Sequence, residues 1–308
     1  MASDTIKAFA KVNLTLQVHG RRPDGYHVLS SLVVFADLAD ELAVVDPETH
    51  PPVAYRGPHA EGLGAADRAS DLVTTARDLI GEIFPEWPRP HVVISKAIPQ
   101  AAGLGGGSAD AAAYLTLALK RAEALGAVGD PAGARSLLAK NAAKLGADVP
   151  VCLLREAAFV AGIGDRLQRV PIRQPRHAVL VRPDVAVPDA KTRAVFQALN
   201  ARALESDETP DAPPNNDLEG AMAKAGNDLQ APAIQLMPEI TAALDALEAS
   251  PGARYARLSG AGPTTFALFE TSAAALSAAQ KIAGAHPTWW VQAVRLGSPT
   301  MFEDQAAQ

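Results

Sequence analysis

Residues 97–115 read AIPQAAGLGGGSADAAAYL, and much of the chain can be understood from this stretch. Gly103, Gly105, Gly106 and Gly107 separate an apolar run over 91–95 from an alanine-rich run that begins at Ser108. The pattern predicts a strand, a glycine loop and the start of a helix. Because glycine has no Cβ, backbone N–H groups there can approach an anion, and the helix start adds unpaired donors. We therefore predict a phosphate site; a tight structural turn, the alternative, needs fewer glycines.

The loop differs from the common nucleotide-binding glycine loops. A P-loop has lysine and then serine or threonine after its last glycine, whereas Ser108 and Ala109 follow Gly107. The sequence does not match the dinucleotide-binding fingerprint G-x-G-x-x-G, because Ser108 occupies the position of the third glycine. The His-Arg-Asp and Asp-Phe-Gly tripeptides of protein kinases do not occur. The sequence thus indicates another class of phosphate loop.

Composition places the chain among globular proteins. Its 308 residues are 48% hydrophobic and 20% charged, which suits one large or two medium domains. The net charge of −6 gives no electrostatic footprint for nucleic acid or an anionic membrane, so we expect neither as a partner. We see no signal-peptide pattern and no apolar run of about 18 residues, so we expect a cytoplasmic location. The single cysteine, Cys152, excludes an intrachain disulfide and lies in an apolar run that predicts burial.

An alternating pattern over residues 11–19 predicts a strand with one buried face. Lys11 and Asn13 would point together to its polar side. A turn rich in glycine and proline follows over 20–25, and then come Tyr26, His27 and a second strand.

Helix-capping signals mark two helices in the first half of the chain. Asp71 is a candidate N-cap for one, and Asp130 with Pro131 begins another that stops at Gly146. Pro150 disfavours helical backbone at the residue before it, so we expect the chain to leave Gly146 in an extended form. Asp148 would then lie at a helix-to-strand junction, with either a structural or a functional role.

The order of expected elements in the second half of the chain predicts a ferredoxin-like split βαβ arrangement. We expect helices and strands to alternate there as follows: strand 177–182, helices 190–204, 217–229 and 233–249, strands 255–259 and 264–269, helix 272–285 and strand 289–296. Residues 205–216 are acidic and proline-rich and indicate a surface insertion, for which the sequence offers no function.

Three segments together resemble the GHMP kinases, a family of small-molecule kinases. They are Lys11-Val-Asn-Leu, the segment 99–108 and Leu258-Ser-Gly-Ala-Gly-Pro, in this order. Two more, 20–27 (GRRPDGYH) and 146–150 (GADVP), narrow the resemblance to the 4-diphosphocytidyl-2-C-methyl-D-erythritol kinases.

The resemblance implies an ATP-dependent kinase that phosphorylates the 2-hydroxyl of this cytidine diphosphate compound in the non-mevalonate route to isoprenoids. Another GHMP kinase, acting on homoserine, mevalonate or a sugar, is the nearest alternative. A non-catalytic nucleotide- or RNA-binding module is the alternative of a different class.

The resemblance also implies an α+β fold of two domains. The first, over 1–170, would resemble domain 2 of ribosomal protein S5 and carry the ATP loop, and the second, over 171–308, would be ferredoxin-like. The active site would lie between them, in a monomer or a homodimer.

Residue roles follow from the same resemblance. Asp148 would accept or orient the proton of the attacking hydroxyl, and Lys11 would stabilise charge on the phosphoryl group. The residues implied for ATP are Pro99, Gly103, Leu104, Gly105, Gly106, Gly107 and Ser108. Ser108 could also approach Mg²⁺, although an ordinary N-cap would explain it as well. A solvated strand lysine is the alternative for Lys11.

The substrate would contact residues from both halves. Asn13 would bond near the reacting hydroxyl, Tyr26 would stack on cytosine and His27 would bond its polar edge, while Phe196 would cover the other face. Gly260 and Gly262 would form a second backbone loop near the reacting groups. Structural alternatives are a half-buried turn pair for Tyr26 and His27, a core position for Phe196 and a hairpin turn for the two glycines.

One position departs from the family pattern. The family usually has asparagine where this chain has Asp71. If the family asparagine donates a hydrogen bond from its amide to adenine, an ionised Asp71 cannot replace that bond. The sequence therefore does not predict which residues contact adenine.

Overall fold

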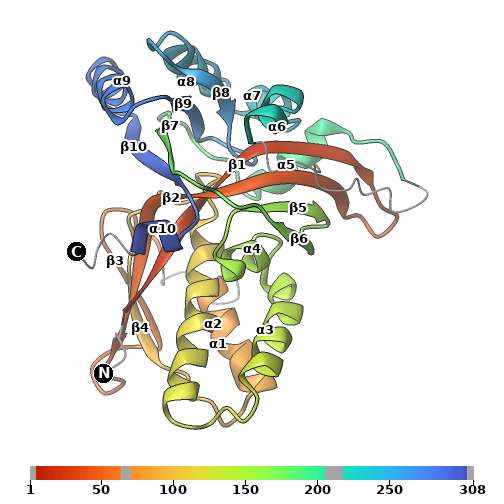
Figure 1. Ribbon diagram of the computed structural model, residues 1–308, viewed down its shortest axis with the longest axis vertical. Coiled ribbons are helices and arrows are strands. Elements are labelled where there is room, and N and C mark those ends of the chain that lie inside the picture. The colour runs from red at the N-terminus through yellow and green to blue at the C-terminus, as the bar shows by residue number, and fades with distance from the viewer. Residues whose placement is uncertain (1–4, 64–70, 205–217, 304–308) are drawn as a thin grey trace. The chain divides into compact units, whose positions relative to one another are not determined.

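A computed structural model describes residues 5–63, 71–204 and 218–303 of the chain (Figure 1). The insertion expected over 205–216 lies outside these described residues. Two compact units can be distinguished by their internal contacts. Unit 1 holds residues 1–10, 38–100 and 105–155, and unit 2 holds 11–37, 101–104 and 156–308. No helix in the described part of the chain is both long and apolar enough to cross a membrane.

Two long strands belong in part to each unit. β1 (Thr5–Arg21) and β2 (His27–Val45) are antiparallel neighbours joined by the expected turn. The strand was expected to bury one face, but β1 is buried on both faces from Ala8 to Leu16. Polar partners from unit 2 cover the side of the strand that carries Lys11 and Asn13. The prediction of an exposed polar face, which used only the alternating sequence pattern, was therefore wrong.

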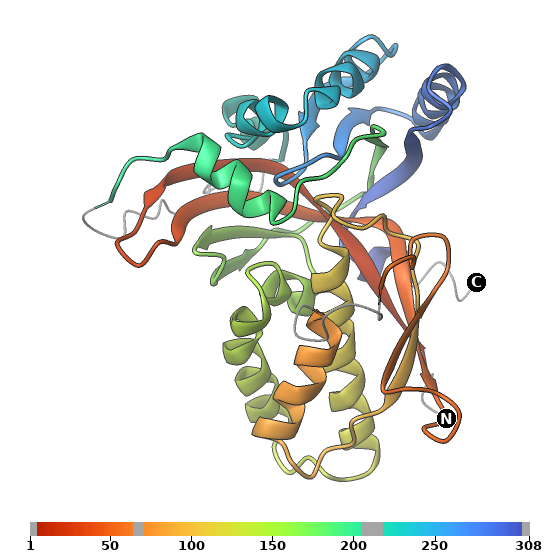
Figure 2. The ribbon, with the colours of Figure 1, turned by 180° about the vertical axis from the view of Figure 1, so that it is seen from behind.

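Unit 1 combines a small sheet with four helices (Figure 2). β3 (Val53–Arg56) runs parallel to β4 (His91–Ser95), which pairs with residues 41–45 of β2. The helices are α1 (Leu72–Ile83), α2 (Gly106–Ala124), α3 (Pro131–Leu145) and α4 (Val149–Leu154). α2 contacts the other three, because its many buried alanines allow close approach.

The expected capping signals in unit 1 are confirmed. Asp71 accepts a hydrogen bond from the backbone N–H of Val73, and Asp130 accepts one from that of Gly133. Trp87, beyond the end of α1, stacks on Phe84 with ring centroids 3.8 Å apart.

The expected exit of the chain after Gly146 is wrong. Residues 149–154 form helix α4, with Pro150 in its first turn. Proline is tolerated there because the first N–H groups of a helix have no helical acceptor. Cys152 lies in this helix and is buried, as expected.

Unit 2 contains the expected ferredoxin-like arrangement. β7 (Arg176–Arg182), β8 (Arg254–Leu258), β9 (Thr265–Phe269) and β10 (Trp290–Gly297) pair antiparallel in the order β10-β7-β9-β8. β7 and β8 therefore run parallel with β9 between them, as do β9 and β10 with β7 between them. A single helix connects β9 to β10 and several helices connect β7 to β8, which gives two split βαβ units.

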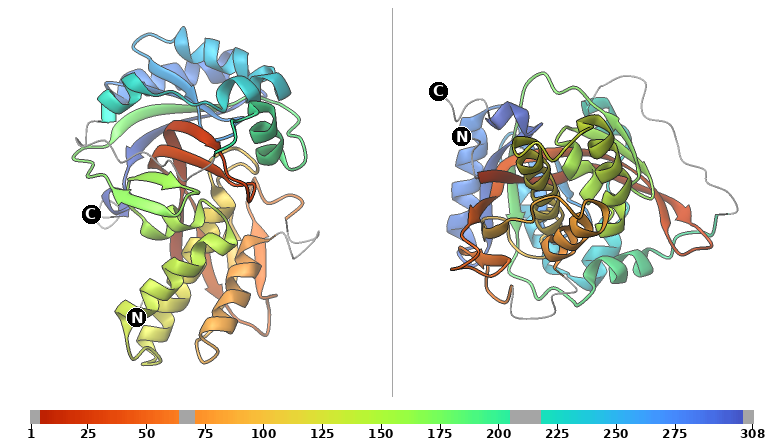
Figure 3. Two further views of the ribbon diagram at one scale, coloured as in Figure 1. Left: turned by 90° about the vertical axis from the view of Figure 1, so that its right-hand side faces the viewer. Right: turned by 90° about the horizontal axis from the view of Figure 1, so that it is seen from below.

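Helices cover one face of this sheet. α8 (Glu239–Glu248) and α9 (Ser272–Ala285) lie over this face (Figure 3). They pack on it through a cluster that includes Val179, Leu247 and Ile282. Trp289 follows α9 and stacks on His286 with ring centroids 3.7 Å apart.

The remaining elements of unit 2 extend the sheet through β2 or pack near Leu16 of β1. β5 (Ala158–Gly162) pairs with residues 29–33 of β2 and with β6 (Arg166–Arg169), and β10 pairs with Phe35 and Ala36 of β2. α5 (Lys191–Leu199) and α7 (Gln230–Leu236) share an apolar cluster with Leu16. α6 (Leu218–Lys224) and α10 (Thr300–Glu303) are short. The helix expected over 233–249 is divided at Met237 and Pro238.

Candidate active site

The second half of the glycine loop forms the start of α2 in unit 1. Gly105 is the N-cap, with left-handed backbone at φ 66°, and its carbonyl accepts the N–H of Ala109 at 2.8 Å. Ser108, expected as a possible N-cap, is instead the third residue of the helix. The N–H groups of Gly106, Gly107 and Ser108 thus belong to the first turn, where a helix has no acceptor for them.

The first half of the loop is fastened inside unit 2. The carbonyl of Ala102 accepts the N–H of Thr264 at 3.1 Å, and that of Leu104 accepts the N–H of Lys11 at 2.9 Å. A Cβ at Gly103 would lie 2.6 Å from the Ser259 carbonyl oxygen, and the residue has φ 81°. Only glycine fits this close approach of two backbones without strain. The side chains of Pro99 and Leu104 are buried.

Lys11, Asn13 and Gly260 come together in unit 2. Lys11 Nζ donates to Asn13 Oδ1 at 2.5 Å, and Asn13 Nδ2 donates to Ser31 Oγ at 2.8 Å. A Cβ at Gly260 would lie 3.5 Å from Lys11 Nζ. Since Lys11 is only 4% exposed, the alternative of a solvated strand lysine is wrong.

An aromatic group lies at the start of β2. The rings of His27 and Phe196, the latter from α5, have centroids 4.6 Å apart and are tilted by 30°. Burial, and then the charge of Arg21, lowers the pKa of His27, so its ring is neutral at pH 7. Tyr26 is 59% exposed, which is unusual for so large a ring and leaves its face open to a ligand.

Asp148 lies at a turn between two helices of unit 1. It is the N-cap residue of α4, but its side chain makes no capping hydrogen bond. A Cβ at Gly146 would lie 3.9 Å from Ser108 Oγ, so this turn lies beside the start of α2. Asp148 and the second half of the glycine loop thus belong to one compact region.

A buried charged group that the sequence did not reveal lies next to the same helix start. Lys96 Nζ donates to Asp110 Oδ2 at 2.5 Å and to Asp40 Oδ2, and Asp40 Oδ1 accepts the N–H groups of Ala97 and Ile98 at 2.6 and 2.9 Å. The group therefore ties both ends of the glycine loop to β2. Its only sequence signal is that charged residues occur within otherwise apolar runs.

Asp71 is occupied by local partners. Its Oδ1 accepts from Val73 N at 3.0 Å and from the Tyr55 hydroxyl at 2.6 Å, and its Oδ2 accepts from Thr74 Oγ1 at 2.8 Å. Burial, and then the bond to this carboxylate, raises the pKa of Tyr55. The position serves helix capping in this chain.

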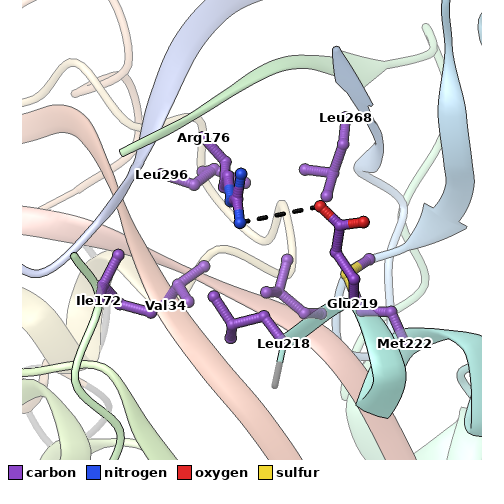
Figure 4. A pocket seen from close by; sticks show the side chains of 9 residues that line it. Val34, Ile172, Arg176, Leu218, Glu219, Met222, Leu268 and Leu296 are labelled. Carbon is purple, nitrogen blue, oxygen red and sulfur yellow. Dashed lines mark ion pairs between the residues drawn. The ribbon is translucent and has the colours of Figure 1, made fainter. Parts of the chain in front are cut away.

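An apolar cavity elsewhere in unit 2 contains none of the predicted site residues (Figure 4). It lies between α6 and the sheet and is lined by Leu14, Val34, Met222 and Leu268, with an Arg176–Glu219 ion pair of 3.7 Å at its side. Across the described residues, no group of three or more His, Cys, Asp or Glu side chains could hold a metal ion.

Comparisons with known proteins agree with this architecture. The N-terminal domain of GHMP kinases matches residues 71–156, and the C-terminal part of GHMP kinases matches residues 203–287. The chain is 44% identical over 303 residues to a 4-diphosphocytidyl-2-C-methyl-D-erythritol kinase from Rhodopseudomonas palustris, with 94% of each chain covered. The chain belongs to this kinase family. Members from Cereibacter sphaeroides are similar to it too, at 42% identity over 292 residues.

Solved structures show the same family and a wider fold. A crystal structure of 4-(cytidine 5'-diphospho)-2C-methyl-D-erythritol kinase is 32% identical, with a TM-score of 0.71, and covers 96% of this chain and 99% of its own. The mevalonate kinase of Methanococcus jannaschii, at 11% identity and a TM-score of 0.59, shares the fold. The two-domain GHMP fold expected for a 4-diphosphocytidyl-2-C-methyl-D-erythritol kinase is thereby confirmed. The domain boundary near residue 170 stays a prediction.

Proposed function

We propose that the chain transfers the γ-phosphoryl group of ATP to the 2-hydroxyl of 4-diphosphocytidyl-2-C-methyl-D-erythritol, a step of the non-mevalonate route to isoprenoids. The observation that carries the proposal is the 44% identity to a kinase of this name over 94% of both chains. The cytoplasmic location and the monomeric or homodimeric state stay predictions.

The start of α2 supplies the phosphate contacts in this proposal. Its first-turn N–H groups and the positive end of its dipole favour a phosphate, and Gly105 to Gly107 leave the backbone open to it. A Cβ at Gly107 would meet only Leu72 Cδ1, at 3.8 Å, so this part of the loop has free space. Mg²⁺ would enter bound to the phosphates and neutralise their charge, with the hydroxyl of Ser108 as its protein partner.

Asp148 and Lys11 act on the transfer itself. Asp148 accepts or orients the proton of the 2-hydroxyl, whose oxygen bonds to the γ-phosphorus while the bond to the β-phosphate oxygen breaks and ADP leaves. Lys11 stabilises the negative charge of the phosphoryl oxygens. Asn13, which bonds Lys11, holds the alcohol near the reacting atoms, and the backbone of Gly260 and Gly262 lies beside them.

The aromatic group at the start of β2 binds the cytosine. Tyr26 stacks on one face of the base and Phe196 covers the other. His27 bonds its polar edge, and its neutral ring offers one donor and one acceptor. These three residues distinguish the proposed substrate from homoserine, mevalonate or a sugar, none of which carries a base.

The release of ADP from Mg-ATP tests this function. We expect release that depends on 4-diphosphocytidyl-2-C-methyl-D-erythritol, and a loss of at least ~100-fold in kcat for Asp148→Asn, since the general base is removed. Asp130→Asn is the matched control, because an exposed N-cap aspartate becomes an equally good cap there.

Each other outcome contradicts a different part of the proposal. Release of ADP with homoserine, mevalonate or a sugar, but not with the cytidine compound, would contradict the proposed cytosine site and still support a kinase activity. No release with any of these alcohols would favour a non-catalytic module. Wild-type turnover of Asp148→Asn would show that Asp148 does not accept or orient the proton of the hydroxyl.

A further inference from the structure

Lys191 is a buried lysine at the start of α5 to which neither the sequence nor the proposed reaction assigns a role. It is 7% exposed, and its ammonium donates to the carbonyl of Ala101 at 2.8 Å and to that of Gly262. These acceptors lie 90 and 71 residues away along the chain. One side chain thus joins α5, the first half of the glycine loop and the second glycine turn, all within unit 2.

The backbone on both sides of this contact is strained. Ala101 has φ 51° and Ala190, the residue before Lys191, has φ 50°, so two alanines hold the left-handed form that favours glycine. Such strain persists only where surrounding contacts impose it, and it is concentrated at functional sites. Lys191 bonds the carbonyl of one strained residue and directly follows the other.

The segments that Lys191 joins are those to which the proposed function assigns ligands. Residues 101–104 lead into the first turn of α2, which is proposed for phosphate, and their carbonyls hold Thr264 and Lys11. α5 carries Phe196, which meets His27 at the proposed base site. A displacement of the lysine would therefore change both sites.

We propose that Lys191 is a positioning residue that fixes the glycine loop and the Gly260–Gly262 turn against the start of the helix that carries Phe196. The inference rests on the proposed function for the identity of the two ligands. Lys191 touches neither of them and acts through the backbone that it holds.

The test compares Lys191→Met with Lys281→Met, an exposed lysine of α9 in the same unit. Methionine keeps the length of the side chain and removes its donors. We expect the KM for ATP and the KM for the cytidine substrate to rise together by about tenfold in Lys191→Met, as for the loss of a charged hydrogen bond. Lys281→Met should match the wild type in both constants.

Two more variants separate positioning from simple stability. Lys191→Gln keeps one donor and should lie between wild type and Lys191→Met, and it serves as the test if the methionine variant does not fold. Adding Ala101→Gly to Lys191→Met should restore part of the ATP affinity, because glycine holds the left-handed form without help. A merely structural lysine would lower the melting temperature of the variants and leave both KM values unchanged.

Calorimetric titration measures the affinity for ATP directly, so this part of the test does not depend on the identity of the second substrate. A wild type that binds ATP but phosphorylates no cytidine compound would overturn the proposed function alone, and the ATP affinity of Lys191→Met would still decide the role of the lysine. A folded Lys191→Met with wild-type ATP affinity and wild-type KM values would overturn the inference.

Discussion

At the scale of single residues, two buried carboxylates share one ammonium group beside the start of α2. Asp40 and Asp110 both accept from Lys96, and Asp110 Oδ1 has no hydrogen-bond partner although it is buried. Burial, and then the charge of Asp40, raises the pKa of Asp110 to about 7, against the opposing effect of Lys96. Burial alone would lower the pKa of Lys96, but the two carboxylates raise it. Asp110 therefore holds a proton below about pH 7, next to the charged ammonium of Lys96.

This proton makes the stability of the chain depend on pH. The unfolded chain releases it near pH 4 and the folded chain near pH 7, so the free energy of unfolding falls as pH rises through this window. We expect the wild type to lose up to ~4 kcal/mol of stability between these values from this group, since one pKa unit corresponds to ~1.4 kcal/mol. Asp110→Asn cannot ionise, so its urea unfolding should depend less steeply on pH.

Asp165→Asn is a control for this experiment, because it changes an exposed aspartate of unit 2. Its stability should follow that of the wild type from pH 4.5 to pH 8. Parallel curves for wild type and Asp110→Asn would contradict the assignment of the proton to Asp110.

At the scale of elements, the glycines of the loop have different structural roles. Gly103 has φ 81° and faces the Ser259 carbonyl, whereas Gly107 lies in the first turn of α2 with space around its Cα. We expect Gly103→Ala to lower the free energy of unfolding by ~2 kcal/mol or more, because both backbone strain and a clash arise. Gly107→Ala should change it by less than ~1 kcal/mol. Urea unfolding of the two variants measures this difference, and equal losses would contradict it.

The elements show what local signals can and cannot predict. Asp71 and Asp130 were correct as caps because capping depends on a few neighbouring residues. Pro150 was misread because proline both ends one helix and suits the first turn of the next, and only the packing of α4 on α2 and α3 selects the second case. The burial of Lys11 depends on Ser259 and its neighbours, far away in the sequence.

At the scale of the whole molecule, the two units share the chain in alternating segments. The chain passes between them after residues 10, 37, 100, 104 and 155. Family motifs predicted the site residues through short local segments. They could not predict Lys191 or Asp40, which belong to no motif and whose partners lie 71 to 90 and 56 residues away. Such contacts follow only from the folded backbone.

This alternation can be tested against the predicted boundary near residue 170. A chain ended after residue 170 would keep Phe35 and Ala36 of β2 but lose their β10 partners, and would expose apolar residues such as Leu16. We therefore expect it to lack a cooperative thermal transition and a near-ultraviolet circular dichroism signal, both of which the full chain should have. A cooperative transition of the short chain would support consecutive domains over 1–170 and 171–308.

The three tryptophans of the chain are divided between the units. Trp87, stacked on Phe84, belongs to unit 1, and Trp289, stacked on His286, belongs with Trp290 to unit 2. Indole emission from a Trp87→Phe variant would therefore come from unit 2 alone, and emission from a variant with both other tryptophans replaced would come from unit 1. The chain thus contains its own fluorescent labels, with which the opening of each half can be watched separately and without an added dye.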